Sequence, residues 1–227
     1  MSKLTTLGMR EVFENAVSLL AKNGYDVKSA KLTQSELRSE VKMSASSTRF
    51  HLPVTINDQI NGNAFNTEKR LNLQDVFITS AIGVYVAAPS SDTDTQYELS
   101  TYAPVNLFTG ANEVQAIKGA YSNGNLSMII DNDQILPFYP LNWHYKVPFT
   151  QAATNAFYDA SDITLQDSRD GSFDGIMQIE PNFILSGNAQ IDFNLNLPSA
   201  MAAAKANSRF VVVQYGLLAQ NCTKVAQ

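Results

Sequence analysis

Two stretches near the C-terminal end decide the fold: Ala189–Leu197, AQIDFNLNL, and Phe210–Leu218, FVVVQYGLL. The first alternates apolar and polar side chains, and this period of two predicts a β-strand with one face toward solvent. The second is almost wholly apolar, which is typical of a strand that is buried on both faces. We therefore expect a mainly β protein.

Similar short strands recur from residue 48 onward, separated by turn signals rich in Asn, Asp and Gly. The expected strands are Thr48–Ile56, Leu71–Ala87, Tyr97–Tyr102, Leu126–Ile130, His144–Phe149, Ile163–Gln166, Ile176–Leu185, Ala189–Leu197 and Phe210–Leu218. A helical turn or two is expected at Ala200–Ala206. Because there are too few helices to cover both faces of a parallel sheet, the pattern predicts a single antiparallel β-sandwich, jelly-roll-like in topology.

A helix is expected before the strands. Apolar residues recur at helical spacing from Leu7 to Lys22, and Asn23-Gly24 supplies a stop signal. Tyr25–Ser47 has few large apolar residues and many Ser, Lys and Glu, which indicates an extended arm or a short helix around Ser35–Lys42. Residues 1–47 are thus predicted to be an N-terminal amphipathic helix and arm, and residues 48–227 the β-sandwich domain.

The composition favours assembly. Charged residues make up 16% of the 227-residue chain, against roughly 25% in ordinary soluble proteins. Neutral polar groups, mostly amides and hydroxyls, are therefore expected to cover much of the surface. Such a surface costs less free energy to desolvate than a charged one, which suits a protein that packs against copies of itself or against other chains. An ordinary β-sandwich composition is the alternative interpretation.

Charge is unevenly distributed along the chain. Residues 1–50 contain eight Lys and Arg against five Asp and Glu, a net of +3, and the remainder contains eight against sixteen, a net of −8. The N-terminal part is therefore suited to docking on an acidic neighbour. Its basic residues are interleaved with acidic ones and form no dense run, so contact with nucleic acid is not expected.

The number of cysteines and the N-terminal sequence together predict the cellular compartment in which the protein is made. Cys222 is the only cysteine, so no internal disulfide is possible, and no Cys/His cluster predicts a zinc site. The N-terminus lacks the uninterrupted apolar core of a signal peptide, which predicts synthesis in a cytoplasm. The longest apolar stretch, Val76–Ala88, is too short and too interrupted to span a membrane. No cofactor, metal or membrane role is expected.

An Asp/Gly-rich segment, Asp167–Asp174, offers three carboxylates to a calcium ion. It lacks the ligand spacing and terminal Glu of an EF-hand, and Arg169 opposes cation binding. A solvated hairpin loop around Asp170 is therefore favoured, with a cation site or an enzyme site of unrecognised type as the alternatives.

The other residues with potential chemistry are isolated from one another. They are the acidic pairs Asp131 and Asp133, and Asp92 and Asp94, the histidines His51 and His144, and Cys222. Both acidic pairs fall in turn signals, where Asp is favoured for backbone geometry. The histidines lack a second ligand at metal spacing, and the cysteine has no base near it in the sequence. We therefore assign no catalytic residue and expect a protein that is not an enzyme.

The densest aromatic stretch, Pro137–Phe149, contains the single tryptophan of the chain. Exposed rings at Tyr139, Trp143 and Tyr145 can stack on sugar faces in a lectin-like site, or they can fill a subunit interface, where Trp and Tyr are enriched. Core packing at a strand corner is the favoured interpretation, and the other two stay open.

Several segments together resemble bacteriophage virion proteins, most of all jelly-roll coat proteins. They are the N-terminal helix and arm, Thr67–Asp75 (TEKRLNLQD) leading into a long strand, Gly124–Ile130 (GNLSMII), and the turn and strand from Leu185 to Pro198. The resemblance covers residues 48–218 and rests on patterns rather than on a signature motif.

This resemblance implies a structural role in a closed symmetric particle, a capsid in the first instance. The implied partners are copies of the chain and other virion proteins, and the implied location is the virion, after synthesis in the host cytoplasm. One chain holds strands for a single jelly roll, so a minor or decorating position is also compatible. The alternative function is a carbohydrate- or receptor-binding β-sandwich, as a virion decoration or a tail protein.

Overall fold

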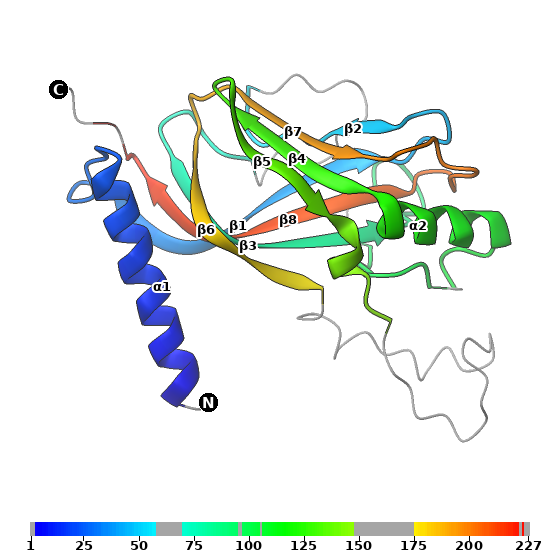
Figure 1. Ribbon diagram of the computed structural model, residues 1–227, viewed down its shortest axis with the longest axis horizontal. Coiled ribbons are helices and arrows are strands. Elements are labelled where there is room, and N and C mark those ends of the chain that lie inside the picture. The colour runs from blue at the N-terminus through cyan, green and yellow to red at the C-terminus, as the bar shows by residue number, and fades with distance from the viewer. Residues whose placement is uncertain are drawn as a thin grey trace.

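The structure is a computed structural model that describes residues 3–57, 70–94, 97–104, 106–147, 175–222 and 224, with side chains from residue 13 onward. The described residues form two four-stranded sheets, two α-helices and one short 3-10 helix (Figure 1). All neighbouring strands in both sheets are antiparallel. The predicted mainly β, antiparallel class is therefore confirmed, and the two sheets are compatible with a sandwich.

The first four strands pair with the last four in reverse order, so the chain folds back on itself as an antiparallel pair of long segments. The elements are α1 (Lys3–Lys22), β1 (Lys31–Lys42), β2 (Arg49–His51), β3 (Val76–Ala87), α2 (Ala111–Asn123), β4 (Asn125–Ile130), β5 (Asp133–Pro140), η1 (Leu141–His144), β6 (Ile176–Ser186), β7 (Ile191–Asn196) and β8 (Arg209–Gln220). One sheet has the order β1-β8-β3-β6 and the other β2-β7-β4-β5. β1 thus pairs with β8, β2 with β7, β3 with β6 and β4 with β5.

The hairpin between β4 and β5 is the point at which the chain turns back. Its two central residues, Asp131 and Asn132, have φ values of 49° and 69°. Positive φ at both positions matches the twist of the flanking strands, and Asp and Asn tolerate it better than other non-glycine residues. Ile130 pairs with Asp133 directly across the turn. The turn predicted from Asp131-Asn132-Asp133 is confirmed.

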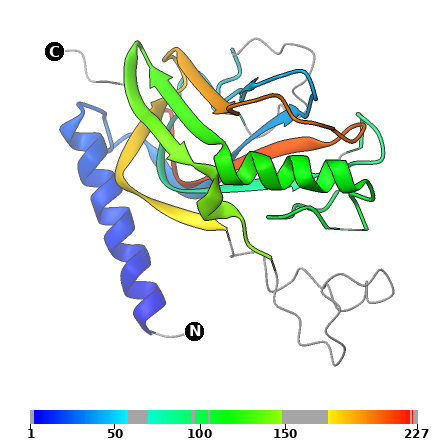
Figure 2. The same ribbon diagram turned by 45° about the vertical axis from the view of Figure 1, so that its right-hand side comes forward.

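One hydrophobic core lies between the two sheets. Phe210 of β8 and Phe193 of β7 are both almost fully buried in it, although they come from different sheets. The rings of Phe50 and Phe210 meet edge to face, with their centroids 5.4 Å apart. α2 packs against the same core (Figure 2), where the buried Tyr121 hydroxyl donates a hydrogen bond of 3.1 Å to the Val84 carbonyl.

β8 has the burial that its sequence predicts, and β7 has it in part. In β7, Phe193 is fully buried whereas its neighbour Asp192 is partly exposed. β8 is covered on both faces, because Val212 packs between the sheets while Val211 packs on the opposite face against Tyr85. Burial of β8 on both faces is therefore confirmed. The polar face of β7 is solvent-exposed only in part, because Asn194 on that face is 2% exposed.

A β-bulge interrupts β3 between Thr79 and Ala81. The extra residue reverses the alternation of side chains along the strand, so both Phe77 and Ile82 face the core although they differ in parity. Gly216 of β8 lies opposite Thr79, directly beside the bulge. The long strand expected at Leu71–Ala87 is thus irregular near its centre.

Three predicted elements are wrong in the described residues, and a fourth lies outside them. No strand forms at Tyr97–Tyr102 or over the described part of His144–Phe149, no helix forms at Ala200–Ala206, and Ile163–Gln166 is outside the described residues. In the first two, large apolar or aromatic residues at alternate positions imitate a strand, as Tyr97 and Leu99 do, but no ladder of strand pairing forms. Tyr145 packs singly on Tyr121. The alanine-rich segment is too short to offset the cost of helix nucleation.

The segment expected to be an arm is an edge strand. β1 is extended, and it pairs with β8 along its whole length, so the alternative of a short helix around Ser35–Lys42 is wrong. Pairing with a long apolar strand outweighs the weak helical tendency of its Ser, Glu and Lys residues. The predicted boundary after residue 47 falls between β1 and β2. The helix expected at Leu7–Lys22 is confirmed as α1, whereas α2 and β5 are not anticipated.

Candidate functional site

β5 is an edge strand of its sheet, with β4 on one side and no strand on the other among the described residues. Most of its side chains are exposed. An edge strand leaves a row of backbone groups unpaired, and proteins commonly protect such edges with proline. Pro137 and Pro140 do so here because neither has an N–H to offer a further strand. Contacts at this edge therefore rest on side chains more than on an extended sheet.

Large apolar side chains are exposed along β5, η1 and the residues that follow. We define the β5–η1 surface by four of them: Ile135, Phe138, Trp143 and Val147. Phe138 is 64% exposed and Trp143 is 49% exposed. The other large apolar side chains exposed in the described part of the chain are dispersed, at Phe13, Ile56 and Leu73. Contiguous exposed apolar groups are typical of interaction sites, and these four side chains follow one another closely along the chain.

The Trp143 ring packs on a buried aromatic ring of β5. Tyr139 is buried, and its ring meets the Trp143 ring edge to face with centroids 5.4 Å apart. Burial raises the pKa of Tyr139 to about 12. Tyr145 is half-buried and packs on Tyr121, also with centroids 5.4 Å apart. Of the three rings considered for sugar stacking, Trp143 is the exposed one, and the core-packing interpretation fits Tyr139.

His144 joins η1 to the start of β6. Its ring is fully buried, and its Nδ1 atom lies 2.5 Å from the carbonyl oxygen of Gly175. Burial lowers the pKa of His144, although the hydrogen bond to Gly175 opposes that effect. The ring is therefore neutral at neutral pH and contributes to packing beside the β5–η1 surface.

This burial predicts a loss of stability at acidic pH. The unfolded chain binds a proton at His144 near pH 6.5, whereas the folded chain binds it only at a lower pH, so the free energy of unfolding falls as the pH drops through this window. The loss is about 1.4 kcal/mol for each unit by which the pKa is lowered. An NMR titration of the ring protons measures the pKa, and urea unfolding at pH 7 and pH 5 measures the loss. A native pKa of 6.5 or higher would contradict the prediction.

α1 contacts the body of the protein only through its C-terminal part in the described side chains. Ala16 and Leu20 are buried in a small core with residues of β3 and β8, on the face of that sheet that points away from the central core. Phe13, one turn earlier, is 42% exposed. Gly24 ends the helix with φ of 78°, as its sequence predicts. The helix then continues toward the N-terminus well beyond the sheet (Figures 1 and 2).

A buried charge cluster covers the outer face of β1 and β8. Glu40 of β1, 2% exposed, lies opposite Val211 and is placed between two arginines. Its two carboxylate oxygens lie 2.6 Å from Arg38 Nε and 3.1 Å from Arg209 Nη1. The Tyr97 hydroxyl donates to Glu40 as well, and both guanidinium groups lie over the Tyr97 ring, at 5.2 and 5.0 Å from its centroid.

These contacts give the cluster a structural role. Burial, with the hydrogen bond to Glu40, raises the pKa of Tyr97. The Glu40 carboxylate is neutralised by two cations and is covered by the ring, so it is closed to a substrate. Its effect is to fix β1 on β8 and to hold the segment at Tyr97 against the sheet.

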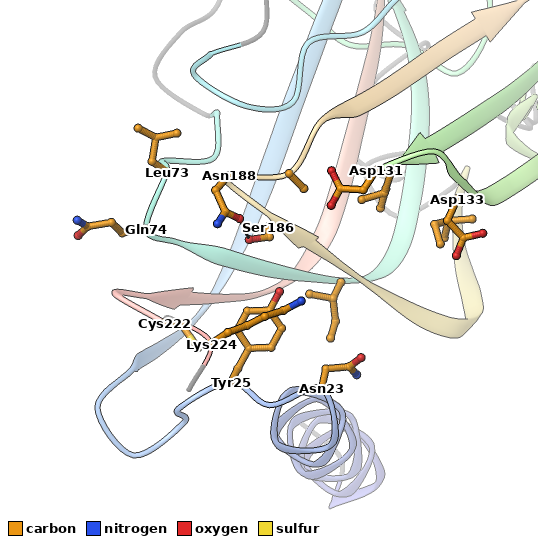
Figure 3. Close-up of a pocket in the computed structure, with 14 residues that line it drawn as sticks. Asn23, Tyr25, Leu73, Gln74, Asp131, Asp133, Ser186, Asn188, Cys222 and Lys224 are labelled. Carbon is orange, nitrogen blue, oxygen red and sulfur yellow. Dashed lines mark hydrogen bonds between the residues drawn. The ribbon is translucent and has the colours of Figure 1, made fainter. Parts of the chain in front are cut away.

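A polar pocket of about 710 Å³ opens between the end of α1, the β4–β5 hairpin and the β6–β7 turn (Figure 3). Its lining includes Asn23, Tyr25, Asp131, Asp133, Asn188 and Lys224. Figure 3 shows Asp131 and Asn188 on one side of the space and Tyr25 and Lys224 on the other. The Lys224 ammonium lies 5.5 Å from the centroid of the Tyr25 ring and covers it. Amide, carboxylate and ammonium groups around one space can hydrogen-bond a polyhydroxylated ligand.

The acidic pairs singled out from the sequence make local contacts. Asp92 forms an ion pair of 2.8 Å with Lys42, and Asp94 accepts hydrogen bonds within its own turn. Asp131 accepts a hydrogen bond of 2.9 Å from the Gln190 backbone, which joins the β4–β5 hairpin to the start of β7. These contacts explain Asp92, Asp94 and Asp131 as turn and packing residues, whereas Asp133 lines the polar pocket.

The remaining candidates do not gather into one site. His51 lies 3.5 Å from Asp192 at the surface. Cys222 is buried, and burial raises the pKa of its thiol, which disfavours the nucleophilic thiolate. No group of three metal-ligating side chains occurs in the described residues. The segment Asp167–Asp174, with Asp170, lies outside them.

Comparison with the models of known protein families, with curated proteins and with solved structures finds no match to this chain. Among the described residues, no helix is both long enough and apolar enough to cross a membrane. The function is therefore inferred from the strand arrangement and from the surfaces described above.

Proposed function

We propose that this chain is a non-enzymatic structural protein of a bacteriophage particle, a capsid (coat) protein built on a jelly roll. The observation that carries the proposal is the strand pairing. Each strand pairs with the one that mirrors it about the β4–β5 turn, from β1 with β8 to β4 with β5. Eight strands paired in this way in two sheets match the jelly roll, which recurs in viral capsid domains and also in lectins.

The surface of the protein favours a role in a capsid over the other functions that proteins with this topology have. Charged residues are only 16% of the chain, so a contact with another chain desolvates few charges. The β5–η1 surface presents apolar side chains beside a sheet edge, and α1 extends beyond the body (Figure 1). A closed symmetric assembly buries such edges and apolar groups by repeating the same contacts. Copies of the chain and other virion proteins are the partners in this proposal, and the virion is the location.

Assembly tests the proposal directly. We expect the purified protein to sediment as large, discrete species at high concentration, alone or with its natural partners, and to appear as rings, sheets or shells by negative-stain microscopy. Analytical ultracentrifugation across a concentration series measures this. A monomer that persists at the highest concentration, with the partners present, would contradict the proposal.

The polar pocket favours a second candidate, a carbohydrate- or receptor-binding module. Lectins share the jelly-roll topology, and the pocket offers amides and carboxylates at one end of the sheets. In this case the protein stays monomeric in the same experiment and binds glycans on a screening array. Asn188→Ala removes one amide from the pocket and should abolish that binding.

A further inference from the structure

The four edge strands of the described sheets differ in how they resist a further strand. β2 is only three residues long, β5 contains Pro137 and Pro140, and β6 contains Pro181 at the point where its pairing with β3 is interrupted. Short strands and prolines are common protections of a sheet edge. β1 has twelve residues and no proline, and only β8 lies beside it in the described part of the chain (Figure 1). β1 therefore lacks the protection that the other three edges have.

The backbone of β1 directs hydrogen-bonding groups to this edge. Just after the strand, the Met43 N–H donates a hydrogen bond of 2.8 Å to the Ser208 carbonyl, which extends the continuous pairing with β8. Successive residues of an antiparallel strand turn their N–H and C=O groups to opposite sides. Odd-numbered residues of β1 therefore face β8, whereas Leu32 and Gln34 turn these groups toward the open edge.

The first half of β1 is the more accessible part. None of the six side chains of Lys31–Glu36 is buried, whereas four of the six in Leu37–Lys42 are. In the second half, the Ser39 hydroxyl donates a hydrogen bond of 2.6 Å to the Pro53 carbonyl, so another segment of the chain lies against the strand there. A further strand can consequently be added most readily along the first half.

We propose that β1 pairs with β1 of a second copy along this first half, antiparallel and about a twofold axis at Thr33. This inference rests on the proposed assembly function and names one contact of the assembly. The occupant has to be a strand with an open edge, and β1 is the strand that offers one in the described part of a second copy. A contact between the same edge of two copies is isologous, and it has twofold symmetry.

The twofold axis restricts the register. It runs perpendicular to the sheet, and side chains alternate between the two faces, so the axis passes at a residue rather than between two residues. With the axis at Thr33, Leu32 of each copy pairs with Gln34 of the other, and these are the residues whose backbone groups face the open edge. Thr33 then lies opposite Thr33, a favourable cross-strand pair, and Lys31 lies opposite Ser35, so no like charges oppose each other.

A cysteine at the axis tests this register in the full-length chain. Directly opposed residues that are not hydrogen-bonded have Cα atoms about 4.5 Å apart, which permits a disulfide. We expect Thr33→Cys to form a disulfide-linked dimer under mild oxidation, whereas the unmodified chain, whose Cys222 is buried, should not.

Lys31→Cys is the matched control. Its position is more exposed than that of Thr33, but the two copies of residue 31 would lie about 13 Å apart along the paired strands. Lys31→Cys alone should therefore give much less dimer than Thr33→Cys. A mixture of Lys31→Cys chains with Ser35→Cys chains should restore the cross-link, because these two positions face each other.

A charge swap tests the pairing without a covalent bond. Thr33→Lys and Thr33→Glu each place two like charges across the axis, so each should raise the dissociation constant of the dimer about fivefold or more. An equal mixture of the two variants should restore the affinity, because lysine then faces glutamate. Sedimentation equilibrium measures the dissociation constants, and thermal melting followed by far-UV circular dichroism shows that each variant is folded.

The outcomes separate this inference from the proposed function. Large particles with no Thr33→Cys cross-link above the Lys31→Cys control would overturn the β1 pairing and leave the assembly function standing. A cross-linked dimer that never forms larger species would support the pairing and contradict the coat function. A chain that stays monomeric would overturn both. Cross-linking of Thr33→Cys only to a different protein would overturn the pairing between copies.

Discussion

The Glu40→Gln variant is expected to lose about 3–5 kcal/mol of its free energy of unfolding. The substitution keeps the size of the side chain but removes the negative charge between Arg38 and Arg209. Arg209 is only 1% exposed, so water cannot replace the lost partner. An uncompensated buried cation costs far more than the net contribution of the intact pair. Urea unfolding followed by far-UV circular dichroism measures the loss.

The matched control is an ion pair on the same strand. Lys42 of β1 lies 2.8 Å from Asp92, and both side chains are partly exposed. Lys42→Ala is therefore expected to cost about 1 kcal/mol or less. Equal losses in the two variants would show that burial of the cluster does not govern its contribution.

The Gly216→Ala variant is expected to fail to fold, or to lose about 4 kcal/mol or more of its free energy of unfolding. A Cβ atom at this position would lie 1.8 Å from the carbonyl oxygen of Ile78 on the paired strand. That oxygen belongs to the backbone beside the β3 bulge, so relief requires the two strands to separate. Soluble yield and thermal melting measure the effect.

Gly119 provides the opposite case for the same substitution. It is an exposed residue within α2, and an added Cβ would have no atom within 4 Å. Gly119→Ala is expected to raise stability by about 1 kcal/mol, because alanine favours the helix. A Gly216→Ala protein that melts at the temperature of the unmodified chain would contradict the first prediction, whatever the result at Gly119.

The strands that the sequence predicts correctly are those that bury apolar side chains. β7 was recognisable because Ile191, Phe193 and Leu195 alternate with polar residues, and β8 because both of its faces are apolar. β1 was not recognisable, because Glu40 on its outer face is buried in ion pairs with Arg38 and Arg209 rather than among apolar groups. Hydrophobic periodicity does not detect burial of that kind.

The sequence signals for β5 and α2, the other two elements that were not predicted, point in different directions. The two prolines of β5 argue against a central strand and permit an edge strand, which is what forms. For α2 the sequence does contain a helix signal. Gly110 at the start, Glu113 in the first turn, and Ile117 and Tyr121 four residues apart together indicate a helix that is buried on one side.

The candidate surface was only partly predictable. The aromatic stretch drew attention to Trp143, which is exposed, and to Tyr139, which is buried beneath it. Nothing in the sequence distinguishes Phe138, which is the most exposed of the large apolar residues in the described part. Which of two adjacent rings faces solvent depends on the register of β5 with β4, and that register is irregular near Met128. Sequence alone does not set it.

The pairing of β1 with β8 also determines when parts of the chain can fold during synthesis. Lys42 pairs with Arg209 and Lys31 with Gln220, so during synthesis at about 5–20 residues per second β1 waits roughly ten to forty seconds for its partner. The place where α1 rests includes Leu217 and Ala219 of β8, so it does not exist before then either. Long-range pairing of this kind also folds slowly, on the order of milliseconds to seconds. A nascent chain consequently cannot seat α1 on its own sheet before the end of β8 has been synthesised.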